Sequence, residues 1–191
     1  MSSKKRLIVG MSGASGAPLT IELLKRLRDN PDVETHLIIT RSAGLTLLQE
    51  TGLSADELKS LADICYDNES IGARPASGSF RTEGMIVIPC SMKTVAGIAS
   101  GYSDNLLLRA ADVCLKERRK LVLVARETPL STLHLKNLYE VSMLGAMVMP
   151  PVPAWYRKPV TMEDCVRDTV SRVLRQFGIE DTEGGYEWTG I

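Results

Sequence analysis

The sequence is poor in the residues from which disulfides, metal centres and histidine-dependent active sites are built. It has two histidines, and no two of its four cysteines stand at CxxC spacing: Cys65, Cys90, Cys114 and Cys165. A disulfide framework, a zinc site and thioredoxin-like redox chemistry are therefore not expected. We expect reduced, buried thiols and no bound metal.

An excess of one charge and long apolar runs are also lacking. The 23 basic residues balance 23 acidic ones, so no global field attracts nucleic acid or anionic membrane. No run approaches the roughly 20 apolar residues that span a bilayer. The apolar run near the N-terminus is too short and too broken by glycine for a signal peptide. We expect a cytoplasmic protein with no nucleic-acid or membrane partner.

What is present is an alternation of buried strands and amphipathic helices. Apolar runs of strand length are Arg6–Met11, Thr35–Thr40, Gly84–Pro89, Lys120–Ala125 and Ala146–Pro150. Helical patterns lie between and after them, over 17–29, 105–120, 131–145 and 161–177. Continuous apolar strands alternating with helices predict a doubly wound parallel α/β sheet, a Rossmann- or flavodoxin-like three-layer sandwich. We expect one flavin-binding domain over 1–191 with a tail from about 179, and irregular structure over Ala62–Glu83 and Met149–Pro159.

The first candidate site is the glycine-rich turn "VGMSGASGAP", Val9 to Pro18, between a strand and a helix. Backbone amides that open a helix are suited to a phosphate. The spacing is GxxGxxG, which is neither the GxGxxG of dinucleotide folds nor a P-loop. By itself the turn is compatible with a phosphate ligand or with a tight structural turn.

Two further loops of small residues strengthen the case for a ligand. Ser91, Met92, Lys93 and Thr94 follow the third predicted strand, and Pro75–Phe80 precedes it. Three such loops in one crevice at the carboxyl ends of the strands favour a flat ligand with one phosphate. FMN fits better than a triphosphate, which normally brings a magnesium site. Ordinary βα turns are the alternative for each loop.

Four blocks carry a resemblance to a known family: "GMSGASGAP", "PASGSFRTEGMIVIPCSMKT", "NLLLRAADVCLKERRKLVLVARETPLSTLHLKN" and "GAMVMPPVPAWY". From Leu7 to Phe177 the chain resembles the UbiX/Pad flavin prenyltransferases. The resemblance implies transfer of a dimethylallyl group from dimethylallyl monophosphate to N5 and C6 of reduced FMN, without metal. It also implies that the prenylated FMN serves a UbiD-type decarboxylase, and a homo-oligomer, a dodecamer by analogy, with sites between subunits. The sequence leaves a diphosphate donor open.

The resemblance also implies roles for individual residues. FMN is expected to contact Gly13, Ala14, Ser15, Thr40, Ser91, Met92, Lys93, Thr94 and Arg126. The residues expected to act in catalysis are Ser15, Glu50, Lys116 and Glu127. The donor phosphate is expected to contact Arg109, Lys116, Tyr156 and Arg172, with the proline-rich segment Met149–Pro159 as a lid; we call it the lid segment. The charged run Arg118–Lys120 is expected to be solvated, as are Arg167 and Arg175.

Two other functions fit part of the pattern. Cysteine decarboxylases share the flavin-binding architecture, but they use a histidine in the loop that here spans Ala62–Glu83, and this loop has none. An FMN carrier or companion subunit of a decarboxylase would not need a second phosphate site. His36 and His134 are expected to pack rather than to catalyse, and Trp188 belongs to a tail of unassigned role.

Overall fold

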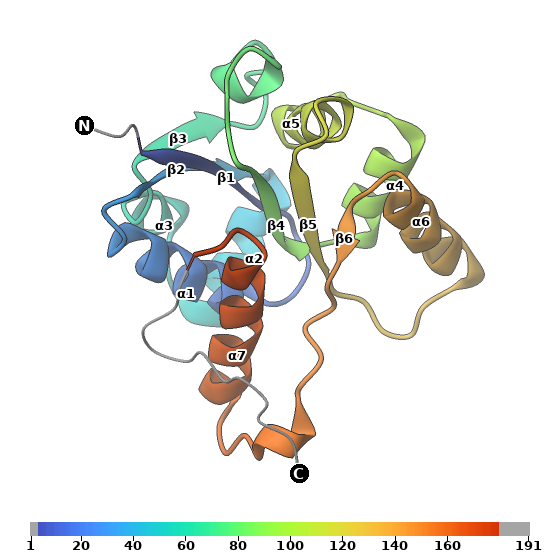
Figure 1. The fold of residues 1–191 in the computed structure, drawn as a ribbon. Coiled ribbons are helices and arrows are strands. Elements are labelled where there is room, and N and C mark those ends of the chain that lie inside the picture. The colour runs from blue at the N-terminus through green and yellow to red at the C-terminus, as the bar shows by residue number, and fades with distance from the viewer. Residues whose placement is uncertain (1–3, 180–191) are drawn as a thin grey trace.

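The computed structural model describes residues 4–179, which form a six-stranded parallel sheet (Figure 1). Its strands are β1 (Lys5–Met11), β2 (Val33–Ile39), β3 (Ile64–Asp67), β4 (Gly84–Cys90), β5 (Lys120–Ala125) and β6 (Met147–Val148). They lie in the order β3-β2-β1-β4-β5-β6, and all neighbours are parallel. The order reverses between β1 and β4, and in such sheets the crevice outside the carboxyl ends of these two strands binds ligands.

Helices cover both faces of the sheet, which confirms the predicted three-layer α/β fold. One apolar core joins the sheet to α1 (Ala17–Arg28), α2 (Arg41–Thr51), α3 (Ala55–Lys59) and α7 (Met162–Arg175). A second core joins the other face to α4 (Met92–Ser100), α5 (Leu106–Lys116) and α6 (Thr132–Met143). Two short 3-10 turns are η1 (Arg74–Ala76) and η2 (Trp155–Arg157). No helix between residues 4 and 179 is long and apolar enough to cross a membrane.

The structure corrects the prediction of irregular structure over Ala62–Glu83, because β3 lies within it. This strand has four residues at the edge of the sheet, and their side chains alternate between half-buried and exposed. So short a run, with Cys65 and Asp67 facing solvent, lacks the continuous apolar pattern of the central strands. β6 is shorter than its predicted range, because Pro150 cannot donate a ladder hydrogen bond.

The expected signals are present at both ends of the helices. Pro18 stands in the first turn of α1. Thr161 and Asp164 form a reciprocal capping box at the start of α7, so aspartate here does what glutamate or glutamine more often does. Gly145 and Gly178 follow α6 and α7 with positive φ, the conformation that glycine adopts most readily.

Candidate functional site

An apolar cavity of about 500 Å³ opens at the carboxyl edge of the sheet, beside the switch point between β1 and β4. Three residues predicted for the site line it together: Ser15 after β1, Glu50 on α2 and Arg126 after β5. The rest of its wall is Gly16, Pro18, Leu19, Pro151, Pro153, Met162, Cys165, Val166 and Thr169. A mostly apolar wall with a few convergent polar groups is typical of sites for small organic ligands.

Glu50 connects the polar groups of this cavity. Its Oε2 accepts hydrogen bonds from the backbone amides of Gly16 at 3.0 Å and Ala17 at 2.8 Å. Burial opposes the charged form of Glu50, but hydrogen bonds from Ser15, Gly16 and Ala17 and the charge of Arg126 outweigh it and lower the pKa. The anion at the N-terminus of α1 is therefore the protein's own carboxylate, whereas the sequence pattern of the turn left a phosphate ligand and a tight structural turn open.

A second, polar cavity of about 460 Å³ lies at the same edge of the sheet. It is lined by four residues predicted to bind FMN, namely Thr40, Ser91, Lys93 and Thr94, and also by Arg41, Ser42, Leu45, Asn68, Glu69, Asp104, Asn105, Leu107 and Leu108. Thr40 caps α2 and Ser91 caps α4 with their side-chain oxygens. Its wall has two cations, Arg41 and Lys93, and two carboxylates, Glu69 and Asp104. The hydroxyl groups, the helix N-termini and the Lys93 ammonium group make the side near α4 suited to a phosphate.

The glycine turn joins the two cavities. A Cβ at Gly13 would lie 2.5 Å from the Ser42 hydroxyl oxygen, so only glycine lets the turn approach the polar cavity this closely. Ser15, two residues on, lines the apolar cavity. One ligand that spans both cavities would therefore pass along Gly13–Ser15.

Ser12 is a residue of this region that sequence reasoning missed. Its side chain is buried, and its hydroxyl donates to the Pro89 carbonyl at 2.9 Å and accepts from the Ser91 amide at 2.8 Å. It therefore fixes the end of β4 against the end of β1, next to Ser91, which lines the polar cavity. Its only signal in the sequence was its place between a buried strand and Gly13.

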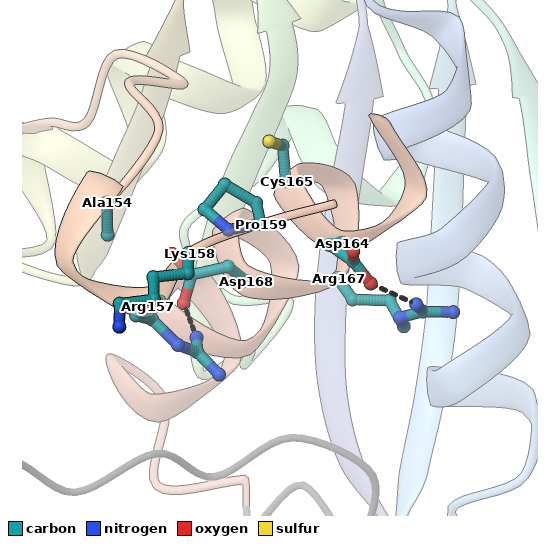
Figure 2. Close-up of a pocket in the computed structure, with 8 residues that line it drawn as sticks. All are labelled: Ala154, Arg157, Lys158, Pro159, Asp164, Cys165, Arg167 and Asp168. Atoms are coloured by element: carbon teal, nitrogen blue, oxygen red, sulfur yellow. Dashed lines mark hydrogen bonds and ion pairs between the residues drawn. The ribbon is translucent and has the colours of Figure 1, made fainter. Parts of the chain in front are cut away.

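The end of the lid segment, Arg157 to Pro159, lies beside Asp164 and Cys165 at the start of α7 (Figure 2). Its prolines Pro151 and Pro153 line the apolar cavity. Tyr156, in η2, is 59% exposed, and Arg172 is exposed on α7. Glu127 is exposed next to Arg126, and its carboxylate accepts a hydrogen bond from the Thr128 amide at 3.0 Å. These three predicted residues do not line either cavity of the described chain.

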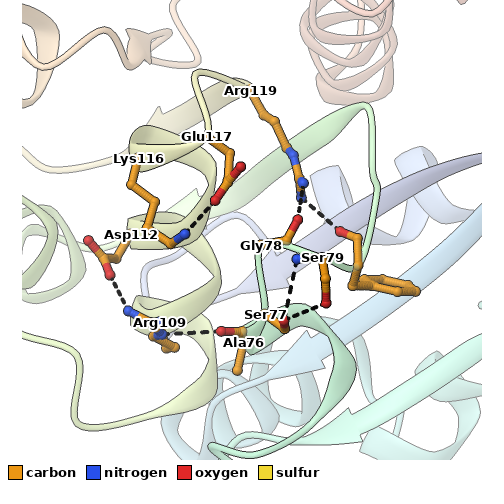
Figure 3. Close-up of polar contacts among 10 residues, drawn as sticks. Ala76, Ser77, Gly78, Ser79, Arg109, Asp112, Lys116, Glu117 and Arg119 are labelled. Atoms are coloured by element: carbon orange, nitrogen blue, oxygen red, sulfur yellow. Dashed lines mark hydrogen bonds and ion pairs between the residues drawn. The ribbon is translucent and has the colours of Figure 1, made fainter.

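Arg109 and Lys116 lie elsewhere, on α5 beside the loop 77–79 (Figure 3). Arg109 donates to the Ala76 carbonyl at 3.2 Å and pairs with Asp112 at 2.6 Å, and Lys116 pairs with Glu117. The C-terminal end of α5 precedes the start of β5, at the amino edge of the sheet, whereas Arg126 follows the end of β5. One chain alone does not bring these cations to the apolar cavity.

This arrangement corrects two predictions. The loop Pro75–Phe80 does not share the crevice with the other two loops, because it precedes a parallel strand and so reaches the amino edge of the sheet. Arg119 is not simply solvated. It is half-buried and donates to the carbonyls of Phe80 at 2.8 Å and Gly78 at 2.5 Å, which holds this loop against α5.

The two histidines have structural contacts, as expected, but the prediction of buried thiols is wrong for Cys65, which is exposed, and Cys165 is half-buried. His36 is buried between Tyr66 and Phe80 and contacts Glu34, and burial lowers its pKa. His134 caps α6. All four thiols are free, and burial raises the pKa of Cys114 to about 12. Among residues 4–179, no group of three His, Cys, Asp or Glu side chains could hold a metal ion. Trp188 lies outside the described residues.

The fold and the cavities at the switch point define an α/β flavoprotein, and the Flavoprotein family model matches residues 1–173. The chain is 51% identical over 187 residues to the flavin prenyltransferase UbiX of Escherichia coli K12, covering 97% of this chain and 99% of that protein. It belongs to the UbiX-like flavin prenyltransferase family.

Two solved structures of relatives are similar over nearly their whole length. A dodecameric FMN-dependent UbiX-like decarboxylase from Escherichia coli O157:H7 is 54% identical with a TM-score of 0.94, covering 97% of this chain and 100% of that one. AnUbiX (PadA1), in complex with FMN and dimethylallyl pyrophosphate, is 47% identical with a TM-score of 0.89, covering 96% of this chain and 100% of that one.

Proposed function

We propose that this protein is a flavin prenyltransferase that joins a dimethylallyl group from a dimethylallyl phosphate to N5 and C6 of reduced FMN. The observation that carries the proposal is the pair of cavities joined by Gly13–Ser15, one lined by hydroxyl groups and cations and the other mostly apolar. Membership of the UbiX-like family supports the same reaction.

The residues present fit FMN in one orientation. Its phosphate would contact the hydroxyl groups of Thr40, Ser91 and Thr94 and the Lys93 ammonium group in the polar cavity. Its ring system would extend past Gly13 towards Ser15 and Arg126 and leave the remaining apolar volume to the prenyl chain. When bound, reduced FMN supplies the nucleophilic atoms that accept the prenyl carbons.

Glu50 and Ser15 are proposed to handle the proton that leaves during ring closure. The lowered pKa keeps the Glu50 carboxylate ionised at neutral pH, so it can accept a proton and cannot act as the resting acid. The hydrogen bond between Ser15 and Glu50 gives that proton a path from the cavity to the carboxylate. Glu127, exposed beside Arg126, is proposed to act beside the departing phosphate as a proton donor or relay.

The donor phosphate needs cations, and we propose that a neighbouring subunit supplies some of them. Neither Arg109 nor Lys116 lines the apolar cavity, and Lys116 ends α5 at the amino edge of the sheet, opposite Arg126. A second copy of the chain is the proposed source of these cations at that cavity. The dodecameric relative supports an assembly of this kind. Tyr156 and Arg172, exposed on the lid segment and α7, complete the proposed phosphate contacts.

Guanidinium and ammonium groups would then stabilise the leaving phosphate in the role that magnesium has in other prenyl transfers. We propose a metal-independent reaction with the monophosphate as the donor. The relative bound to dimethylallyl pyrophosphate makes the diphosphate the second donor to test. The proposed product, prenylated FMN, would be consumed by a UbiD-type decarboxylase in the cytoplasm.

The test is an anaerobic reaction of the purified protein with reduced FMN and a donor, either dimethylallyl monophosphate or dimethylallyl diphosphate. The released flavin is then analysed by mass spectrometry. The expected product is FMN heavier by one prenyl unit, formed equally with EDTA present. Unchanged FMN with both donors would overturn the proposed transfer and favour an FMN carrier. Activity that disappears with EDTA and returns with magnesium would overturn the metal-independent reaction alone.

A further inference from the structure

The lid segment of this chain is tied to α7 by an ion pair. Arg157, at the end of η2, contacts the carboxylate of Asp168 in the second turn of α7 through one of its guanidinium nitrogens (Figure 2). The two side chains are 25% and 14% exposed. A pair shielded from water to this degree is screened less than ion pairs on an open surface.

The backbone of η2 couples the position of Arg157 to that of the preceding residue, Tyr156. The Arg157 amide bonds to the Ala154 carbonyl at 2.9 Å, and the Lys158 amide bonds to that of Trp155 at 3.0 Å. Lys158 then has a φ of 51°, in the left-handed region, and reverses the chain towards α7. Tyr156 is part of the same single turn, so a constraint on Arg157 also limits where the Tyr156 ring can lie.

The ion pair also stands next to the proposed reaction site. A small cavity of about 270 Å³ separates η2 from the start of α7, and Arg157, Asp168 and Cys165 line it. Cys165 lines the apolar cavity as well, so a single side chain lies between the ion pair and the space assigned to the prenyl group. A movement of η2 relative to α7 would therefore be felt at that cavity.

We propose that Arg157 and Asp168 are positioning residues that hold η2 against α7 and thereby place Tyr156 over the donor phosphate. The inference rests on the proposed function, because Tyr156 is assigned to the donor there. Neither side chain is proposed to touch a substrate. Their effect is on the ordering of the lid segment, which a donor would otherwise have to produce on binding.

The kinetic test compares Arg157→Gln with a matched control, Arg167→Gln. Arg167 lines the same small cavity and pairs with Asp164, but both partners of that pair belong to α7. Arg157→Gln should raise KM for the donor about fivefold, the equivalent of roughly 1 kcal/mol of lost ordering, and leave the Kd for FMN unchanged. Arg157→Lys should recover part of the loss, and Arg167→Gln should match the wild type.

A second measurement reports on the lid segment without turnover. Trp155 lies in η2, and Trp188→Phe makes it the only tryptophan of the chain. Time-resolved fluorescence anisotropy of Trp155 should show a larger fast component in Arg157→Gln than in Arg167→Gln. Equal anisotropy in the two variants, or an equal KM in an active enzyme, would overturn the inference. Absence of prenyl transfer by the wild type would overturn the proposed function instead, and the anisotropy comparison would still test the ion pair.

Discussion

Replacement of Glu50 by Gln should lower both the free energy of unfolding and the rate of turnover. The same carboxylate accepts hydrogen bonds from the amides at the start of α1 and is the proposed proton acceptor. A glutamine keeps an acceptor for the amides of Gly16 and Ala17 but loses the charge at the N-terminus of α1. A charged acceptor is worth about 1 kcal/mol more than a neutral one, and a carboxylate at a helix N-terminus adds about 0.3–1 kcal/mol. Solvent screening at this exposed residue brings the expected loss in unfolding free energy to about 1 kcal/mol at pH 7.

The pH dependence gives this prediction its sign. The folded-state pKa of Glu50 is lowered from 4.5, so the stabilisation is complete above that value and is lost as the pH falls through the lower folded-state pKa. Urea unfolding at fixed protomer concentration should therefore show a constant gap between wild type and Glu50→Gln from pH 8 to about pH 5.5, and a shrinking gap below about pH 4.5.

Glu50→Gln should also lower turnover about a hundredfold, because the reaction loses its proton acceptor. Glu57→Gln is the matched control, because Glu57 is also a helix-capping carboxylate with a lowered pKa, on α3 outside both cavities. It should leave turnover unchanged. Wild-type turnover in Glu50→Gln, or a stability gap that persists undiminished in acid, would show that the charge of Glu50 is not what matters.

Two further substitutions test other parts of the site and the fold. Ser12→Ala leaves the half-buried Ser91 amide without its acceptor. It should weaken FMN binding about tenfold but leave riboflavin binding unchanged, and Ser12→Thr should restore the affinity for FMN. Equal losses for both flavins in fluorescence titrations would refute a specific effect on the phosphate. Gly84→Ala places a Cβ 2.1 Å from the Lys120 carbonyl oxygen at a φ of 141°, and should cost about 3 kcal/mol or more in urea unfolding; near wild-type stability would mean that β4 can shift at its start.

The central sheet could be predicted from the sequence because buried parallel strands are continuous apolar runs with few other interpretations. "KLVLVA" and "GMIVIP" could hardly be anything else between helical patterns. The strand β3 could not be found in this way, because "ICYD" is short and carries polar groups on its exposed side. Its pairing depends on β2, which lies 25 residues earlier in the chain, counted from Ile39 to Ile64, and local pattern contains no information about that neighbour.

The site could be predicted in part. The residues that follow β1, β4 and β5 were located by rule, because the carboxyl ends of parallel strands share one edge. Ser12 was missed because a buried serine that links two strands has no periodicity. The family resemblance named Arg109 and Lys116, but only the structure shows that neither lines the apolar cavity and that Lys116 lies at the opposite edge of the sheet from Arg126. The sequence names the residues of a site but does not show how many chains are needed to bring them together.

The glycine turn shows that a helix N-terminus suited to an anion can be occupied by a side chain of the same protein. Free amides at the N-terminus of α1 do attract an anion, as the turn predicts. Glu50 supplies it from α2, and the hydroxyl groups and cations suited to a phosphate gather instead in the polar cavity, at the N-termini of α2 and α4. If these two amides held a phosphate, they would contribute to ligand binding alone. Because they hold the Glu50 carboxylate and lower its pKa, they keep a proton acceptor charged at the apolar cavity. We infer that the turn serves the chemistry of the site at Gly16 and Ala17, and cofactor binding along Gly13–Ser15, where Gly13 packs against Ser42 and Ser15 lines the apolar cavity.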